Sequence, residues 1–337
     1  MKKACVIGAG AWGAALAMVL CDNGYQVFIW ARNEKTVEEI NQRRQVPRLA
    51  GIQLPPGITA VSDPLEAARD ASIVVSAVPS SAVSEVARTF AFLLPEDSIV
   101  VSATKGFDEA TLRRPSEVWK DIAPSLEGRL VVISGPNFAQ EIAQKLPAAT
   151  VIAGKDPSAR ELAQTAFMTR YFRVYTHWDV IGVELGGALK NIIALACGMV
   201  EGMGLGYNAQ AGIISRGIAE VTRLGVAMGA DPLTFAGLSG LGDLVLTSTG
   251  HLSRNRQAGI AVGKGEPVQS FLNRTGYTVE GLSTVKTVQR LAAIYKVSMP
   301  ITDVVYRILY ENLPVHRGLY EIMNREKRAE PEDYFVR

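Results

Sequence analysis

The chain has 337 residues, which at about 150 residues per domain is enough for two domains. Hydrophobic residues make up 48% and charged residues 20%, the balance of an ordinary globular protein, so disorder and fibrous repeats are not expected. The formal net charge of +2 is too near neutral for a surface that binds nucleic acid or an anionic membrane.

Cysteine and histidine are too sparse for a metal site or a disulfide framework. The three cysteines lie in apolar contexts, and the three histidines lack the spacing of metal ligands. We therefore expect no metal and a reducing, cytoplasmic compartment. The strand pattern begins at the N-terminus, which leaves no room for a signal peptide. We expect no membrane span.

Short β-branched runs alternate with helical patterns over the first 180 or so residues. This alternation is typical of parallel βαβ units, so residues 1–180 are predicted to form a Rossmann-like α/β domain with a doubly wound sheet. Helix starts are marked by Asp-Pro pairs, with Asp63, Asp156 and Asp231 as expected N-caps. The expected strands are residues 4–8, 26–30, 57–61, 72–78, 98–104, 130–134, 149–154 and 172–176.

After about residue 180 the strand pattern stops. Long segments rich in Ala, Leu, Gly and Ile follow, with apolar spacings of three and four. Residues 181–337 are therefore predicted to form an all-α domain. Residues 301–320 illustrate the pattern, because one apolar stripe runs along them and Pro314 restarts the helix.

A Gly-Ala-Gly-Ala-Trp-Gly sequence links the first expected strand to the first expected helix. Gly8 would make the tight turn, Gly10 would let the backbone approach a pyrophosphate, and Gly13 would let helix and strand pack closely. The helix N-terminus would then face the phosphates. This arrangement predicts a dinucleotide site, and a purely structural glycine turn is the alternative.

Arg32 bears on the choice of cofactor. NAD-specific folds usually place an acidic residue about 20 residues past the glycine loop, on the ribose 2′-hydroxyl. Here Arg32 lies 19 residues after Gly13. A guanidinium can pair with a 2′-phosphate, so NADP is favoured over NAD, with NAD left open. The alternative is a solvated surface arginine.

Two lysines are candidates for chemistry. Residues 182–198 are small or apolar on almost every face, with Lys190 and Asn191 as the polar exceptions in the middle. A buried, unpaired ammonium is costly, so Lys190 is predicted to line a functional cavity, unless it extends out to water. Lys105 follows an expected strand at its carboxyl end, where open α/β sheets bind ligands. It is a natural partner for an anion, or else a solvated loop lysine.

Residues 253–256, Ser-Arg-Asn-Arg, offer a hydroxyl, a carboxamide and two guanidinium groups. This set suits a phosphate group. Asp243 lies just before it in a Gly/Leu-rich loop. It would orient a substrate hydroxyl or the lysine, and a helix-capping aspartate is the alternative.

Seven motifs in a fixed order resemble the bacterial-type NAD(P)-dependent glycerol-3-phosphate dehydrogenases, and the likeness covers nearly the whole chain. The motifs are GAGAWGAALA at 8–17, SATKGF at 102–107, SGPNFAQE at 134–141, VELGGALKNIIALACG at 183–198, GLSGLGDLVLT at 237–247, SRNR at 253–256 and VEG at 279–281. The resemblance implies interconversion of sn-glycerol 3-phosphate and dihydroxyacetone phosphate with NAD(P), mainly toward glycerol 3-phosphate for phospholipid synthesis. It also implies a homodimer.

The resemblance assigns roles residue by residue. Lys190 matches the catalytic lysine, which would take or return the proton on the C2 oxygen of the phosphorylated substrate. The positions that match substrate-binding residues are Lys105, Gly135, Asn137, Lys190, Asp243, Ser253, Arg254 and Asn255. The positions that match cofactor-binding residues are Gly8, Gly10, Trp12, Gly13, Arg32, Lys105, Ala139, Arg254 and Glu280.

Two positions depart from the family pattern. The family often has Ser or Thr at Ala11, so here backbone amides must replace a hydroxyl contact to the cofactor phosphates. It usually has Ser at Asn137, whose amide can both donate and accept. Two alternatives to the assigned function stay open: another two-domain dehydrogenase of the 6-phosphogluconate or hydroxyacyl type, and a dinucleotide-sensing module without turnover.

Overall fold

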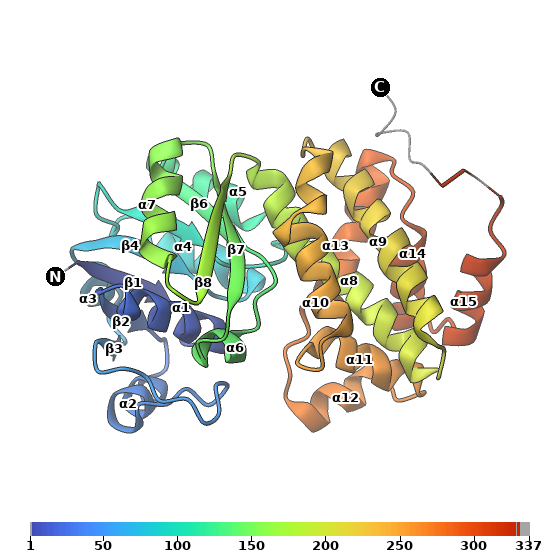
Figure 1. Ribbon diagram of the computed structural model, residues 1–337, viewed down its shortest axis with the longest axis horizontal. Coiled ribbons are helices and arrows are strands. Elements are labelled where there is room, and N and C mark those ends of the chain that lie inside the picture. The colour runs from blue at the N-terminus through green and yellow to red at the C-terminus, as the bar shows by residue number, and fades with distance from the viewer. Residues whose placement is uncertain (1, 328, 331–337) are drawn as a thin grey trace. The chain divides into compact units, whose positions relative to one another are not determined.

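The protein, seen in a computed structural model, is described over residues 2–327, 329 and 330. The chain divides into two compact units, Met1–Val180 and Ile181–Arg337 (Figure 1). The first unit mixes strands and helices, and the described part of the second contains helices and turns. The predicted fold class, a Rossmann-like α/β sheet followed by an all-α half, is therefore confirmed.

The first unit is built on an eight-stranded sheet in the order β3-β2-β1-β4-β5-β6-β7-β8. Every predicted strand is present, and each lies within two residues of its predicted bounds. The first six strands run parallel to one another. The strands are β1 (Lys3–Ile7), β2 (Gln26–Trp30), β3 (Ile58–Val61), β4 (Ala71–Ser76), β5 (Ile99–Ser102), β6 (Leu130–Ser134), β7 (Ala148–Gly154) and β8 (Phe172–His177).

The expectation of parallel βαβ units is wrong at one place, the link from β6 to β7. β7 pairs antiparallel with β6, and β8 runs parallel to β7. The link from β6 to β7 contains one short helix, α6 (Ala139–Ala143). A strand has the same alternation of residues in either direction, so the sequence pattern did not show that the chain re-enters the sheet in the opposite direction after α6.

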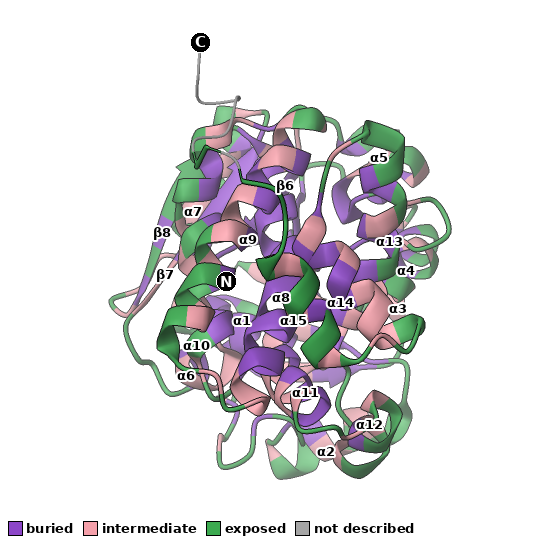
Figure 2. Ribbon diagram, turned by 90° about the vertical axis from the view of Figure 1, so that its right-hand side faces the viewer, coloured by how far each residue is buried: buried purple, intermediate pink, exposed green. Residues whose placement is uncertain are grey.

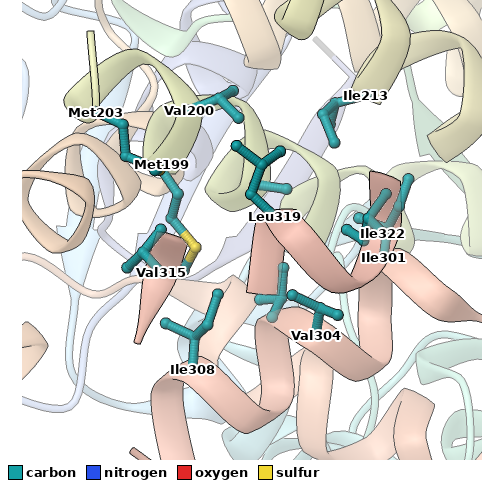
Figure 3. A pocket seen from close by; sticks show the side chains of 12 residues that line it. Met199, Val200, Met203, Ile213, Ile301, Val304, Ile308, Val315, Leu319 and Ile322 are labelled. Carbon is teal, nitrogen blue, oxygen red and sulfur yellow. The ribbon is translucent and has the colours of Figure 1, made fainter. Parts of the chain in front are cut away.

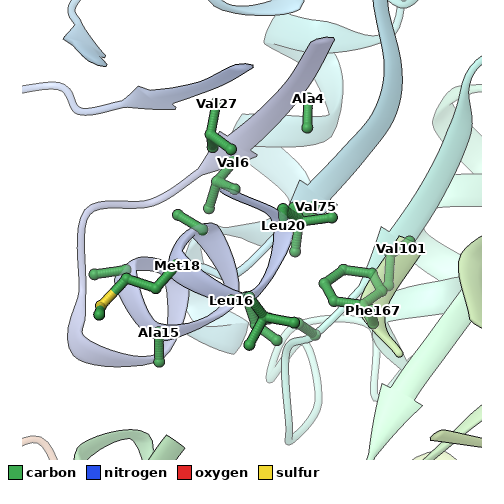
Figure 4. Packing of buried hydrophobic residues seen from close by; sticks show 14 of the residues in the cluster. Ala4, Val6, Ala15, Leu16, Met18, Leu20, Val27, Val75, Val101 and Phe167 are labelled. Atoms are coloured by element: carbon green, nitrogen blue, oxygen red, sulfur yellow. The ribbon is translucent and has the colours of Figure 1, made fainter. Parts of the chain in front are cut away.

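Helices cover both faces of the sheet. On one face, Leu16 of α1 and Phe167 of α7 pack against strand residues such as Val6 (Figure 4). On the other face, Phe90 of α4 and Trp119 of α5 are completely buried. The helices of this unit are α1 (Ala11–Asp22), α2 (Glu34–Arg43), α3 (Pro64–Ala68), α4 (Val83–Phe90), α5 (Pro115–Ile122), α6 and α7 (Pro157–Phe167).

The Asp-Pro pairs start helical turns as predicted. Asp63 accepts a hydrogen bond from the Leu65 amide at the start of α3, and Asp156 accepts one from the Ala159 amide at the start of α7. Asp231 caps a short 3₁₀ helix, Pro232–Ala236, rather than an α-helix. The capping aspartate satisfies an amide that has no partner within the helix, which is why these residues mark helix starts.

The second unit is organised around α8 (Val180–Gly202), which is buried along almost all its length (Figure 2). Among the described residues, α8 is the one helix long and apolar enough to cross a membrane, but 89% of its most apolar window is buried inside the structure. That is the burial of a core helix. The other helices are α9 (Tyr207–Ala227), α10 (Asp243–Thr249), α11 (Arg254–Gly263), α12 (Val268–Thr275), α13 (Glu280–Tyr295), α14 (Pro300–Tyr310) and α15 (Val315–Met323).

Glycines bring the backbones of α8 and α11 into direct contact. A Cβ atom added at Gly198 would lie 2.1 Å from the Arg256 carbonyl oxygen, and one added at Gly259 would lie 2.2 Å from that of Leu195. No larger side chain fits without moving a helix. This contact places the N-terminal turn of α11 beside the middle of α8, where Lys190 and Asn191 lie.

The C-terminal helices enclose a small apolar cavity. Side chains of α8, α9, α14 and α15 line a space of about 30 Å³ (Figure 3). The labelled lining residues are all aliphatic or methionine, so the cavity offers no polar group to a phosphate. It is a feature of the packing between α15 and the helices beneath it.

Candidate functional site

The glycine turn follows β1 and is held between the two neighbouring strands. The Gly8 amide donates to the Trp30 carbonyl at the end of β2, at 3.1 Å. The Ala77 amide after β4 donates to the Ile7 carbonyl at 2.9 Å. Gly8 has φ +116°, and a Cβ there would lie 2.6 Å from the Ala77 oxygen. Only glycine fits this turn, because both the dihedral angle and the contact exclude a side chain.

The other two glycines of the turn differ in their surroundings. A Cβ at Gly13 would lie 2.1 Å from the Gly8 oxygen, so Gly13 lets α1 pack onto the turn. A Cβ at Gly10 would meet nothing within 4 Å. Gly10 caps α1 without a side-chain hydrogen bond, and the first turn of the helix has no acidic residue. An open glycine at an uncapped helix N-terminus fits the approach of a pyrophosphate.

The remaining predicted cofactor positions of this unit have distinct settings. Trp12 is the second residue of α1, and its indole Nε1 is buried with no hydrogen-bond partner. Ala139 opens α6 and is half-buried. Arg32 follows β2, and its side chain is 65% exposed. Its guanidinium Nη1 lies 3.5 Å from the Glu85 carboxylate, which the sequence did not predict.

Lys105 and Gly135, two predicted substrate positions, lie together. The Lys105 ammonium donates to the Gly135 carbonyl at 3.3 Å. They follow β5 and β6, neighbouring parallel strands whose carboxyl ends meet at one edge of the sheet. Asn137 donates from its amide nitrogen to the Ala149 and Pro136 carbonyls, at 2.9 and 3.0 Å. The nitrogen of Asn137 is thereby committed within the protein, and its buried Oδ1 has no hydrogen-bond partner.

Asp108 holds the loop that carries Lys105, a role that sequence reasoning missed. Its carboxylate accepts hydrogen bonds from the Ser84 hydroxyl on α4 and from the amide and hydroxyl of Thr111, each at 2.9 Å. Burial raises the pKa of the Asp108 carboxyl, but the hydrogen bonds from Thr111 and Ser84 outweigh it, so the pKa lies below its ordinary value. The ionised carboxylate is the form that fixes the loop.

In the second unit, Lys190 belongs to a small cluster of polar side chains that lies among largely apolar helices. The Lys190 side chain is 9% exposed and that of Asp243 is 1% exposed, and the ammonium forms an ion pair with the carboxylate. Lys190 also donates to the Thr247 hydroxyl at 2.6 Å, and that hydroxyl donates to Asp243 at 3.2 Å. Lys190 is therefore buried and paired, rather than extended into solvent.

Asp243 and Thr247 are placed by the start of α10. Asp243 is the first residue of that helix, and it follows a π-helical turn over Leu238–Gly242 rather than an open loop. A Cβ at Gly186 of α8 would lie 2.6 Å from the Ser239 oxygen, so the turn rests directly on α8. Thr247 was not predicted, although its spacing of four residues from Asp243 puts both on one helix face.

The predicted phosphate cluster sits at the N-terminus of α11. Ser253 is the N-cap, and its hydroxyl accepts from the Arg256 amide at 3.2 Å. Asn255 is buried, donates to the Asn191 side chain on α8 at 2.9 Å and accepts from the Gly281 amide at 2.9 Å. Ser253 and Asn255 therefore also have structural roles that the sequence did not indicate.

Arg254 and Glu280 border the same cluster. The Arg254 guanidinium lies over the Tyr277 ring, 5.7 Å from its centroid, within the range of a cation–π contact. The ring meets the buried Phe271 edge-on at 6.1 Å. Glu280 opens α13, one residue before the Gly281 amide that Asn255 holds. Among the described residues, no group of His, Cys, Asp or Glu could hold a metal ion.

A Rossmann-like sheet with this glycine turn, joined to a helical half that buries a lysine against a carboxylate, defines a nicotinamide-dinucleotide-dependent dehydrogenase. Two family models agree with this class: the NAD-dependent glycerol-3-phosphate dehydrogenase N-terminus matches residues 3–160, and the C-terminus of the same enzyme matches residues 179–320. The chain belongs to the NAD-dependent glycerol-3-phosphate dehydrogenase family.

Relatives match the chain over its length. A glycerol-3-phosphate dehydrogenase [NAD(P)+] of Corynebacterium aurimucosum is 47% identical over 332 residues, covering 98% of this chain and 100% of that one. One from Thermoanaerobacter sp. is 44% identical over 328 residues, covering 97% and 98%. The crystal structure of glycerol-3-phosphate dehydrogenase from Coxiella burnetii has a TM-score of 0.91 at 35% identity and covers 96% of this chain and 99% of its own.

Proposed function

We propose that the protein interconverts sn-glycerol 3-phosphate and dihydroxyacetone phosphate with NAD(P)H, mainly toward glycerol 3-phosphate for phospholipid synthesis in the cytoplasm. The observation that carries the proposal is the buried Lys190, which Asp243 and Thr247 hold in the interior of the second unit. The relatives named glycerol-3-phosphate dehydrogenase [NAD(P)+] support the choice of substrate. A homodimer is part of the proposal.

The two halves of the chain have separate tasks in this proposal. Residues 1–180 hold the cofactor, through the glycine turn and Arg32. Residues 181–337 supply the catalytic lysine and most of the groups for the substrate. The division of the chain after Val180 supports this assignment.

The nicotinamide, when bound, supplies or accepts the hydride at C2 of the substrate. Lys190 donates a proton to the C2 oxygen during reduction and takes it back during oxidation. Asp243 stabilises the ammonium form of Lys190, and Thr247 fixes the position of the nitrogen by accepting from it and donating to Asp243. A buried ammonium without such partners would be strongly destabilised, so the pair is what permits a lysine at this place.

The phosphate is held by the N-terminal turn of α11 and by Arg254. The first amides of a helix point outward along its axis and carry partial positive charge, which suits an anion. Ser253 and Asn255 shape that turn, and Arg254 adds a guanidinium that Tyr277 holds in place. Binding energy from the phosphate then orients the reacting carbon.

In the first unit, Lys105 and Gly135 lie together at the carboxyl edge of the sheet, and both are assigned to the substrate. Arg32 favours NADPH over NADH, because a guanidinium pairs with the 2′-phosphate that NADPH alone carries. Asn137 takes the place of the serine usual in the family. Its amide nitrogen is engaged with backbone carbonyls, so its contribution to the substrate comes from the carbonyl oxygen, which accepts from a substrate hydroxyl.

The test is the loss of NADPH absorbance when dihydroxyacetone phosphate is added to the purified protein, with NADH as the comparison. A substrate panel with 6-phosphogluconate and a 3-hydroxyacyl substrate separates the neighbouring dehydrogenase types. No turnover of dihydroxyacetone phosphate would refute the proposal, and no turnover of any substrate in the panel, with binding of the dinucleotide retained, would leave a sensing module as the function.

The role of Lys190 is tested by Lys190→Met, which keeps the length of the side chain and removes the charge. Turnover of dihydroxyacetone phosphate should fall by more than tenfold, a barrier increase above about 1.4 kcal/mol. Lys264→Met, at the exposed end of α11, is the matched control and should keep full activity. Circular dichroism checks that both variants are folded. A smaller loss in a folded Lys190→Met protein would refute the catalytic role.

A further inference from the structure

Arg32 and Glu85 meet beside the glycine turn, although they come from different parts of the first unit. Arg32 follows β2, and Glu85 lies in the first turn of α4, which follows β4. β2 and β4 are the two neighbours of β1, the strand that ends in the glycine turn. The two charged side chains therefore reach toward each other from either side of that turn, and Arg32 Nη1 lies 3.5 Å from Glu85 Oε2.

A dinucleotide on the glycine turn would bring its adenosine ribose to the end of β2. NAD-specific folds have a carboxylate at this point, which accepts a hydrogen bond from the ribose 2′-hydroxyl. Here β2 ends at Trp30 and is followed by Ala31, and Asn33 caps α2 by accepting from the Lys35 amide at 2.9 Å. The carboxylate in contact with Arg32 is that of Glu85, from another helix.

We propose that Glu85 is a specificity-determining residue for the cofactor. Its carboxylate accepts from the 2′-hydroxyl of NAD(H), and it weakens the attraction of Arg32 for the 2′-phosphate of NADP(H). Arg32 pairs with the 2′-phosphate of NADP(H), and Glu85 pairs with the 2′-hydroxyl of NAD(H). The chain therefore uses both cofactors. The inference rests on the proposed function, because it takes the glycine turn as the dinucleotide site.

The expected effect is moderate, because both side chains are 65% exposed. Exposed ion pairs contribute about 0.2–1 kcal/mol, which corresponds to a change of up to about fivefold in a binding constant. Removing the Glu85 charge should strengthen binding of the 2′-phosphate by about threefold. Loss of the charged acceptor should weaken binding of the 2′-hydroxyl cofactor by a similar factor.

The experiment is isothermal titration calorimetry of NADP+ and of NAD+ with the parent protein and Glu85→Gln. The ratio of the two dissociation constants should move toward NADP+ by about tenfold in the variant, and the change should shrink as salt is raised. Glu161→Gln on α7 makes the same charge change in the same unit, far along the chain from the glycine turn, and should leave the ratio unchanged. A ratio in Glu85→Gln within twofold of the parent would overturn the inference.

A double-mutant cycle separates the two roles. In an Arg32→Ala background, Glu85→Gln should strengthen NADP+ binding less than it does in the parent, because only the direct repulsion between the carboxylate and the 2′-phosphate is then removed. It should still weaken NAD+ binding, because the 2′-hydroxyl contact is direct. Failure of either result removes the corresponding role. These experiments measure binding and do not depend on turnover. If the protein is inactive but shows these changes in binding, the proposed reaction is refuted and the role of Glu85 is not.

Discussion

Glu220 of α9 is a buried carboxyl, 2% exposed, that caps the N-terminus of α14. It accepts from the Ile301 amide at 2.6 Å and from the Thr302 amide at 3.2 Å. Burial raises its pKa from 4.5 to about 7, against the opposing effect of the two amides and of Arg223. Glu220→Gln removes the titration and keeps a side-chain oxygen that can accept from an amide.

The sign and size of the effect follow from linkage. In the unfolded chain this carboxyl loses its proton near pH 4.5, whereas in the folded protein it keeps the proton to about pH 7. Unfolding releases a proton between these values, so the free energy of unfolding falls as pH rises through this window. From pH 5 to pH 8 the loss is about 2.5 kcal/mol in the parent, and the uncharged amide introduced by Glu220→Gln would not contribute to it.

The assay is urea unfolding of the parent and Glu220→Gln at pH 5 and pH 8, followed by the helical circular dichroism signal that the second unit dominates. All other titrating groups are common to both proteins and cancel in the difference between them. That difference should shift by about 2.5 kcal/mol in favour of the variant at pH 8. An equal difference at both pH values would refute the raised pKa of Glu220.

Two further predictions concern the aromatic contact to Arg254 and the helix packing. In steady-state kinetics, Tyr277→Leu should raise the KM for dihydroxyacetone phosphate about two- to fivefold and leave kcat unchanged. Tyr277→Phe, which keeps the ring, and the exposed control Tyr320→Leu should both match the parent. Gly198→Ala should destabilise the protein by about 3 kcal/mol or more in thermal unfolding, because its Cβ would strike a backbone carbonyl of α11. Gly212→Ala in the open part of α9 should instead stabilise it by about 0.5–1 kcal/mol.

Much of the fold was predictable because it depends on local patterns. Strand positions follow from β-branched runs, and the starts of α3 and α7 follow from Asp63 and Asp156, which satisfy amides within their own helix. The direction of β7 did not follow, because it depends on the path of the chain between β6 and β7 and not on the residues of the strand itself. The period of a pattern identifies a strand, but it does not reveal which way the strand runs.

The candidate site was predictable where a residue stood out from its own segment. Lys190 was visible as a charge in an apolar helix, and the structure adds its partner Thr247, whose spacing from Asp243 could have indicated it. Glu85 gave no such signal. It is an ordinary polar residue in the first turn of an amphipathic helix, and its meeting with Arg32 depends on β2 and β4 flanking β1.

Three cations of this chain share one arrangement, which bears on how it would bind phosphates. Lys190 is paired with Asp243, Arg32 with Glu85, and Arg256 with Glu201 at 2.7 Å. Each of these three positive charges has a carboxylate beside it. A phosphate that approaches such a cation is attracted by the cation and repelled by the neighbouring carboxylate, so the net attraction is smaller than that of the cation alone. Selectivity among anionic ligands then depends on the position of each carboxylate. A Glu-to-Gln change beside a cation should therefore alter ligand preference more than protein stability.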